Sequence, residues 1–126
     1  MVTEALFTPL PPVAGTPPRA MVSIDFNGVP LALPAGITLA AGLLAAGVRR
    51  FRSAPVGGDA RAPYCMMGVC FECLLEIDGV PSQQACLVQP REGMRVRTMD
   101  ALPGLAFPVP ASQPDAESAV CGGRHD

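Results

Sequence analysis

Four cysteines constrain this 126-residue chain more than any other feature of its sequence. Cys65, Cys70, Cys73 and Cys86 follow the spacing C-x4-C-x2-C-x12-C, and a fifth cysteine, Cys121, stands alone near the end of the chain. The first three match the C-x4-C-x2-C run of plant-type [2Fe–2S] sites, in which soft thiolates hold both irons. The spacing therefore predicts a [2Fe–2S] cluster whose ligands are Cys65, Cys70, Cys73 and Cys86.

The residues between the first two cysteines suit a loop that encloses such a cluster. We expect Met66, Met67, Gly68 and Val69 to form this supporting loop, with backbone amides turned inward toward the sulfurs. That backbone conformation is costly for a residue with a Cβ, so glycine fits at position 68 if its φ is positive. The apolar side chains would then face outward or cover the loop and exclude water from the sulfurs.

Other uses of cysteine remain as alternatives. Structural zinc sites usually have two separated C-x2–4-C pairs, a pattern that this spacing does not show. Disulfides fit poorly with an odd cysteine count and no signal peptide. A thioredoxin-like pair at Cys70 and Cys73 would leave Cys65 and Cys86 unexplained. A Rieske centre needs two histidines, whereas the chain has only His125.

The first half of the chain predicts a hairpin followed by a helix. Apolar residues alternate over residues 21–26, which indicates a half-buried strand, and Asn27-Gly28 is a strong hairpin signal before a short strand at 30–33. Thr38 is a plausible N-cap for a helix that runs to about Gly47. Residues 48–64 are rich in glycine, proline and arginine and predict a loop.

The second half predicts three strands. They cover "LLEID" at 74–78, "QACLV" at 84–88 and "MRVRTM" at 94–99, with a hairpin turn at Asp78-Gly79. The layout ββα, long loop, ββ(β) predicts an α+β fold, in which a small mixed sheet packs on one main helix.

Proline content divides the chain into three parts. Residues 1–19 contain five prolines and predict an extended or disordered arm, and residues 103–126 predict a Pro-rich tail. Residues 20–102 remain as the single folded domain. Cys121 in the tail is a spare thiol rather than a ligand, because one extra cysteine cannot hold a second cluster.

Charge and hydropathy exclude several functions. A net charge of −2 gives no general attraction to phosphate backbones, so we expect no nucleic-acid partner. Residues 29–48 carry no charge, but Pro30, Pro34 and Gly36 divide them, so no transmembrane segment is predicted. Without an export signal at the amino terminus, we expect a cytoplasmic protein.

Three segments resemble one known group of proteins. "CMMGVCFEC", "EIDGVPSQQACL" and "REGMRVRT" are similar to the small [2Fe–2S] subunit of heteromeric flavin-dependent amine and imino-acid dehydrogenases, the group of hydrogen cyanide synthase, D-hydroxyproline dehydrogenase and opine oxidase. The resemblance covers about residues 20–100 and implies the β-grasp fold of plant-type ferredoxins. It places the family's four ligands on Cys65, Cys70, Cys73 and Cys86.

The resemblance also implies a function. The chain would be an electron-transfer subunit, not catalytic alone, of a complex that oxidises the C–N bond of an amino or imino acid of the opine, hydroxyproline or glycine type. FAD or FMN would be bound by partner subunits, and electrons would pass between flavins or toward a quinone, which could bring the complex to the membrane periphery. A free-standing ferredoxin that diffuses between enzymes is the alternative, and a structural zinc module is a more remote one.

No residue of this chain is predicted to catalyse the organic step. The sequence has no nucleotide-binding motif and no histidine in its core. Acidic residues near the cysteines, Glu72, Glu76 and Asp78, are expected to be solvated strand or turn positions. The arginines that precede the cysteines, at 49, 50, 52 and 61, either offset the charge gained on reduction and dock an acidic partner or lie at a solvated helix end.

Overall fold

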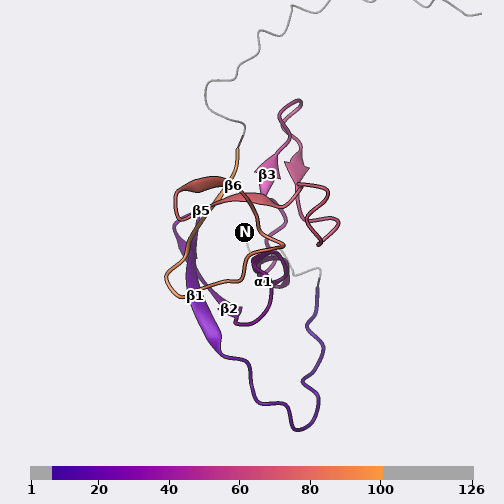
Figure 1. The fold of residues 1–126 in the computed structure, drawn as a ribbon, viewed down its shortest axis with the longest axis vertical. Coiled ribbons are helices and arrows are strands. Elements are labelled where there is room, and N and C mark those ends of the chain that lie inside the picture. Colours follow the sequence, from indigo (N-terminus) through magenta and orange to yellow (C-terminus); the bar gives the residue numbers. More distant parts are fainter. Residues whose placement is uncertain (1–6, 101–126) are drawn as a thin grey trace, which may run out of the picture.

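The computed structural model describes residues 7–100, which form a small mixed sheet wrapped against one short helix (Figure 1). The sheet has five strands in the order β2-β1-β7-β5-β6, and a separate two-stranded ribbon, β3-β4, lies beside it. β1 runs parallel to β7, whereas the β1–β2, β5–β6 and β5–β7 pairs are antiparallel. The elements are β1 (Met21–Phe26), β2 (Val29–Pro34), α1 (Leu39–Ala45), β3 (Arg52–Ser53), β4 (Ala60–Arg61), β5 (Leu74–Ile77), β6 (Val80–Gln84) and β7 (Arg95–Thr98). The predicted α+β fold is confirmed.

The first hairpin forms where its sequence predicts it. Asn27 and Gly28 have φ angles of 51° and 84°, the left-handed pair that a tight two-residue hairpin requires. The Asn27 side chain also connects the hairpin to β7 by two hydrogen bonds. Its Nδ2 donates to Thr98 Oγ1 at 2.8 Å, and its Oδ1 accepts from the Thr98 N–H at 2.9 Å. In β1, Ile24 is buried while the neighbouring Asp25 is exposed, so the predicted alternation holds.

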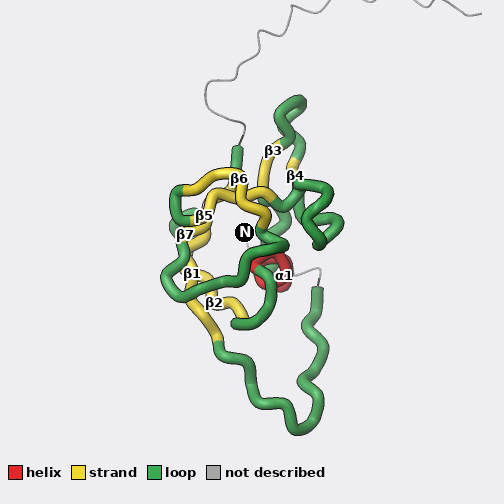
Figure 2. The backbone as a smooth tube through the Cα atoms, in the orientation of Figure 1, coloured by secondary structure: helices red, strands yellow, loops and turns green. Residues whose placement is uncertain are grey.

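Helix α1 lies against the sheet and is shorter than the predicted span (Figure 2). Thr38 is its N-cap, as predicted, with Oγ1 accepting the Ala41 N–H at 3.2 Å. A Cβ at Gly42 would stand 3.2 Å from Leu33 Cδ1, so glycine allows the helix to approach β2 closely. The helix ends at Ala45 because Gly47, with φ of 89°, turns the chain away.

The strand expected over residues 84–88 is displaced toward the amino terminus. Asp78 and Gly79 adopt φ angles of 49° and 82°, and this two-residue turn starts β6 directly at Val80. β6 is an edge strand, which explains why it tolerates Pro81 and exposed polar residues. Residues 85–87 form a turn, so Cys86 leaves the sheet instead of lying within it.

The loop expected over residues 48–64 contains the short strands β3 and β4. Arg52 pairs with Arg61 and Ser53 with Ala60. Phe51, fully buried just before β3, anchors this ribbon to the core, and its carbonyl accepts from Met99 N at 3.0 Å. The sequence did not predict these strands, because two residues are too few to show the alternation of apolar and polar side chains that identifies a strand.

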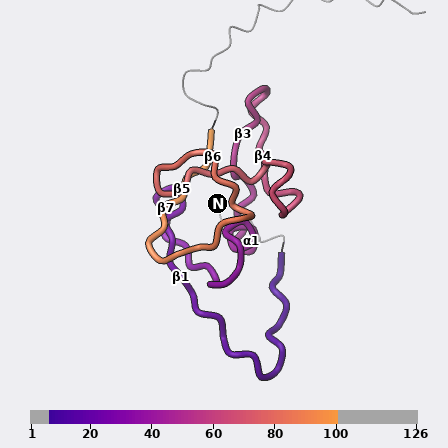
Figure 3. Tube along the Cα trace, in the orientation of Figure 1, coloured from indigo at the N-terminus to yellow at the C-terminus, as the bar shows by residue number. Residues whose placement is uncertain are grey.

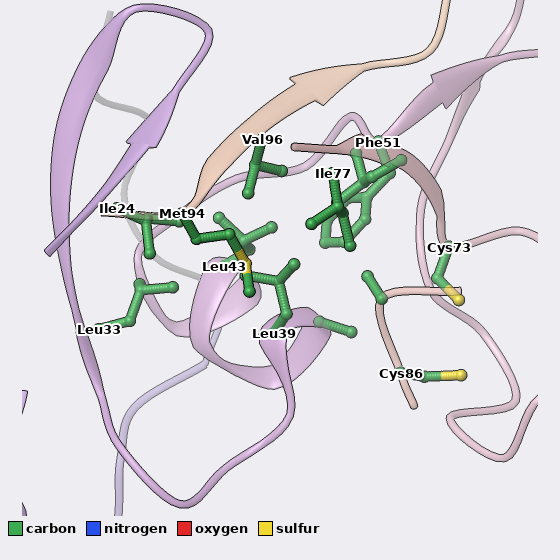
Figure 4. Close-up of a cluster of buried hydrophobic side chains, with 13 residues drawn as sticks. Ile24, Leu33, Leu39, Leu43, Phe51, Cys73, Ile77, Cys86, Met94 and Val96 are labelled. Carbon is green, nitrogen blue, oxygen red and sulfur yellow. The ribbon is translucent and has the colours of Figure 1, made fainter. Parts of the chain in front are cut away.

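The core fills the space between α1 and one face of the sheet (Figure 4). Its large side chains come from α1, from strands β1, β2, β5 and β7, and from residues just before β3 and β7, and two cysteines lie at its border. The fully or nearly fully buried residues of this cluster are Ile24, Leu33, Leu39, Ala40, Leu43, Phe51, Cys73, Leu75, Ile77, Ala85, Cys86, Met94 and Val96.

The ends of the chain lie partly outside the described residues. Residues 7–20 contain no helix or strand, are exposed, and make a long excursion from the domain before β1 (Figure 3). The Pro-rich tail predicted at 103–126 and its Cys121 lie outside the described residues, so those predictions stand as such. Among residues 7–100, no helix is both long and apolar enough to cross a membrane.

Candidate metal centre

The loop that carries three of the cysteines has an unusual backbone. Met66, Gly68 and Phe71 have φ angles of 57°, 90° and 58°, all in the left-handed region. Alternation between left-handed and ordinary conformations turns successive N–H groups toward the inside of a loop and creates a concavity that suits an anion. The positive φ expected at Gly68 is therefore present, together with two others that the sequence did not indicate.

Backbone N–H groups in this loop point at the thiols. Met67 N and Cys70 N each lie 3.4 Å from Cys65 Sγ, and Glu72 N lies 3.5 Å from Cys70 Sγ. The hydrogen bond from Met67, followed by that from Cys70, lowers the pKa of Cys65 to about 6. The loop thus stabilises sulfur in its anionic form, which is the form that binds metals.

The other two cysteines belong to the border of the core. Cys73 and Cys86 are buried, and Figure 4 shows both sulfurs pointing away from Leu39 and Leu43 toward the same side. Burial raises the pKa of the Cys86 thiol, and the neighbouring Cys73 raises it further. A smaller effect of the same sign comes from Cys65.

The amino terminus of α1 holds the segment that carries Cys86. The first two N–H groups of the helix donate to this segment, Leu39 N to Val88 O at 2.7 Å and Ala40 N to Ala85 O at 3.0 Å. These groups have no partner within a helix, so the turn around Cys86 satisfies them. Because β6 ends at Gln84, the carbonyls of Ala85 and Val88 lie beyond the strand and accept these hydrogen bonds.

Gly68 connects the exposed loop to the same segment. Its carbonyl accepts from Gln84 Nε2 at 2.8 Å, and its backbone N–H lowers the pKa of Cys86 by hydrogen bonding. A Cβ at this position would stand 3.1 Å from Leu87 Cδ1. The part played by Gln84 could not be predicted, because a glutamine in a polar edge strand carries no signal for a contact with a distant loop.

The four thiols are available as ligands, and side-chain hydrogen bonds connect them two by two. Cys65 and Cys70 are hydrogen-bonded neighbours, as are Cys73 and Cys86, and all four are free. Among residues 7–100, no three His, Cys, Asp or Glu side chains gather around a single point that could hold one metal ion. A [2Fe–2S] cluster needs two protein thiolates at each iron, and these four cysteines are the candidates to supply them.

Two charged atoms beside the loop are buried without a hydrogen-bond partner. They are Arg52 Nε and Glu72 Oε2. Arg52 reaches the loop through Nη1, which lies 3.4 Å from the Phe71 carbonyl oxygen. We expect Glu72 and Glu76 to be solvated, whereas the structure leaves both side chains only partly exposed.

The remaining charged residues near the cysteines have structural partners or face solvent. Asp78 accepts from Arg95 N at 2.9 Å and forms an ion pair with Arg91, consistent with its predicted place in the turn. Arg50 forms an ion pair with Asp100. Arg61 is exposed on β4, and the last turn of α1 contains no basic residue, so these arginines do not cap the helix.

Apolar side chains surround the cysteine loop on the outside. We call this set the apolar collar: Tyr64, Met66, Met67, Val69, Phe71 and Leu87, all exposed. The outward direction expected for Met66, Met67 and Val69 agrees with their exposure. An exposed apolar patch of this kind is typical of a surface that meets another protein.

Comparison with known proteins agrees with this geometry. The chain matches the family described as "2Fe-2S iron-sulfur cluster binding domain" over residues 19–101, and it belongs to that family. It is 45% identical over 80 residues to hydrogen cyanide synthase subunit HcnA of Pseudomonas aeruginosa, a match that covers 64% of this chain and 76% of the relative. The corresponding subunit of Pseudomonas protegens is 36% identical over 81 residues, with the same coverage.

A solved structure shares the fold. L-proline dehydrogenase from P. horikoshii matches with a TM-score of 0.55 and 22% identity over 65% of this chain, which spans only 16% of that longer protein. The expected [2Fe–2S] cofactor, the ferredoxin-like fold and the resemblance to the hydrogen cyanide synthase group are confirmed by these matches.

Proposed function

We propose that this chain is the electron-transfer subunit of a flavin-dependent dehydrogenase complex, with Cys65, Cys70, Cys73 and Cys86 as the ligands of its [2Fe–2S] cluster. The observation that supports the proposal is the loop whose backbone N–H groups point at Cys65 Sγ and Cys70 Sγ, on a domain of the [2Fe–2S] family. The bound cluster supplies one-electron transfer. The protein's own contribution is to hold the thiolates and donate N–H groups to them.

A permanent complex is supported by the surface around the cysteines. Val69 and Met67 expose 70% and 69% of their surface, next to the loop from which electrons must enter or leave. A carrier that diffuses between enzymes works through weak encounters and usually has a charged surface. An apolar collar with a net charge of only −2 suits a lasting interface. We therefore assign its occupant as a subunit that binds FAD or FMN.

The partner would perform the organic chemistry. The donor would be an amino or imino acid of the glycine, hydroxyproline or opine type, in keeping with the relationship to hydrogen cyanide synthase subunits. Oxidation of a C–N bond releases two electrons to the flavin, which this subunit would take one at a time and pass to another flavin or a quinone. We place the complex in the cytoplasm, with a quinone acceptor drawing it to the membrane surface.

The ligand assignment is tested by comparing Cys86→Ser with Cys121→Ser. Cys86→Ser should lose or weaken the cluster, measured as iron and sulfide per chain and as the EPR signal of the reduced protein. Cys121→Ser is the matched control and should load normally. Unchanged iron content and EPR signal in Cys86→Ser would show that the fourth ligand is misassigned.

The complex is tested by expressing the full chain alone and together with flavoproteins encoded beside it. We expect a flavin-containing complex whose native mass spectrum accounts for iron, sulfide and flavin. Met67→Asp in the apolar collar should reduce the flavin that co-purifies, whereas Val29→Asp, an exposed position outside the collar, should not. A stable, cluster-loaded monomer that never co-purifies with a flavoprotein would instead identify a diffusing ferredoxin.

A further inference from the structure

One peptide group in the cysteine loop is held at both of its ends. The N–H of Glu72 lies 3.5 Å from Cys70 Sγ, and the carbonyl of Phe71, which belongs to the same peptide, accepts from Arg52 Nη1 at 3.4 Å. This peptide lies between Cys70 and Cys73, one cysteine from each pair. Phe71 has a φ of 58°, a conformation that an L-residue adopts at a cost unless its surroundings hold it.

Arg52 is firmly anchored for this role. Its backbone pairs with Arg61 on one side and forms a parallel bridge with Met99 on the other. The residues before and after it, Phe51 and Ser53, also bond to Met99, through Met99 N to Phe51 O at 3.0 Å and Ser53 N to Met99 O at 2.9 Å. The guanidinium therefore projects toward the loop from a rigid base.

The guanidinium of Arg52 is partly buried beside the loop, where the Glu72 carboxylate oxygen Oε2 is buried as well. Its Nε is buried and has no hydrogen-bond partner, which leaves part of the cation's hydration unreplaced. A cluster with four thiolate ligands is net negative, and reduction adds one more negative charge. A cation held against the loop offsets that charge in a partly buried site, where electrostatic interactions are stronger than in water.

We propose that Arg52 is a positioning residue that sets the reduction potential of the cluster by orienting and polarising the Phe71–Glu72 peptide. A cation at the carbonyl oxygen draws electron density from the peptide and makes its N–H a stronger donor to Cys70 Sγ. Hydrogen bonds to the sulfurs are among the features that set such potentials. Because the reduced state carries more charge on sulfur, it gains more, and the potential rises. This inference rests on the proposed role of Cys70 as a ligand.

The test is an EPR-monitored redox titration of the full-length, cluster-loaded protein and three variants. Arg52→Gln removes the charge, and Arg52→Lys keeps the charge but loses the planar fork. Arg61→Gln is the matched control, because Arg61 lies directly opposite Arg52, carries the same charge and is exposed. Iron and sulfide per chain are measured first for every sample.

Arg52→Gln should lower the ratio of reduced to oxidised cluster at a given potential by about threefold to tenfold, which is about 30–60 mV toward lower potential at 59 mV per tenfold for one electron. Arg61→Gln should shift it by less than a third of that. An unchanged midpoint in Arg52→Gln, or an equal shift in Arg61→Gln, would overturn the proposal.

If Arg52→Gln does not retain a cluster, its midpoint potential cannot be measured and a second variant is needed. In that case Arg52→Lys decides: a loaded protein with a lowered midpoint supports the proposal, whereas a wild-type midpoint shows that the contact with Phe71 is not what sets the potential. Failure of Arg52→Lys to load would also count against it, since a purely structural need would then explain both variants. A wild-type protein without a [2Fe–2S] EPR signal would refute the proposed function itself.

Discussion

Gly68→Ala should weaken retention of the cluster by an amount that the loop geometry defines. Gly68 has a φ of 90°, and an L-residue in the left-handed region costs about 1–2 kcal/mol. The new Cβ would stand 3.1 Å from Leu87 Cδ1, but Leu87 is an exposed, flexible side chain that can move aside, so this contact adds little. Alanine at this position therefore destabilises the closed conformation of the loop that holds Cys65 and Cys70, and opening of the loop relieves the strain. A cost of 1–2 kcal/mol is a factor of about 5–30 in an equilibrium.

The assay is loss of the visible absorbance of the cluster in the presence of an iron chelator, with circular dichroism recorded in parallel. Gly79→Ala is the matched control, because its φ of 82° imposes similar strain in open space at the β5–β6 turn, away from the thiols. Gly68→Ala should shift the balance toward the cluster-free form by about 5–30-fold. Gly79→Ala should lower the free energy of unfolding and leave cluster retention near that of the wild type. Equal retention in Gly68→Ala and wild type, or equal loss in the two variants, would refute the assignment of strain to the loop.

Three further outcomes follow from the fold and the proposed donor. Leu43→Ala removes a fully buried side chain between helix and sheet and should lower the free energy of unfolding by about 2–5 kcal/mol in urea titration; a loss below 1 kcal/mol would mean that the core rearranges around it. Thr38→Ala should cost about 0.5–2 kcal/mol by the same measurement, because the Ala41 N–H loses its partner, and Thr38→Ser should recover most of it. If the cluster accepts electrons from amine oxidation through a flavin, its midpoint reduction potential should lie above the roughly −400 mV of plant-type ferredoxins. A midpoint at or below that value in an EPR-monitored titration would argue against this electron donor.

Sequence patterns identified most of the fold because its elements use strong local signals. The β1–β2 hairpin has both alternating apolar residues and an Asn27-Gly28 turn, and α1 has a threonine at its N-cap. The strand at 84–88 was misplaced because "QACLV" is more apolar than the polar, proline-containing β6. Turn geometry at Asp78-Gly79, rather than hydrophobicity, decides which residues pair there.

The spacing of the cysteines predicts candidate ligands, a prediction that Cys86→Ser tests, but the sequence does not predict the residues that support them. Spacing alone brought out the four cysteines, since thiolates in this pattern have few uses. The residues that hold them could not be found in the same way, because the contacts of Gln84 with Gly68 and of Arg52 with Phe71 join segments 16 and 19 residues apart in the sequence. No local sequence pattern around either residue predicts such a contact.

The division of the thiols between core and loop has a consequence for how the site opens. Cys73 and Cys86 are buried in the core cluster, so exposing them disturbs the packing of the core. Releasing Cys65 and Cys70 requires only a local excursion of a short exposed loop, and such excursions are far more frequent in native proteins. If the four cysteines are the ligands as proposed, we expect metal exchange and oxidation to begin at Cys65 and Cys70, and Cys73 and Cys86 to be the slower pair to respond.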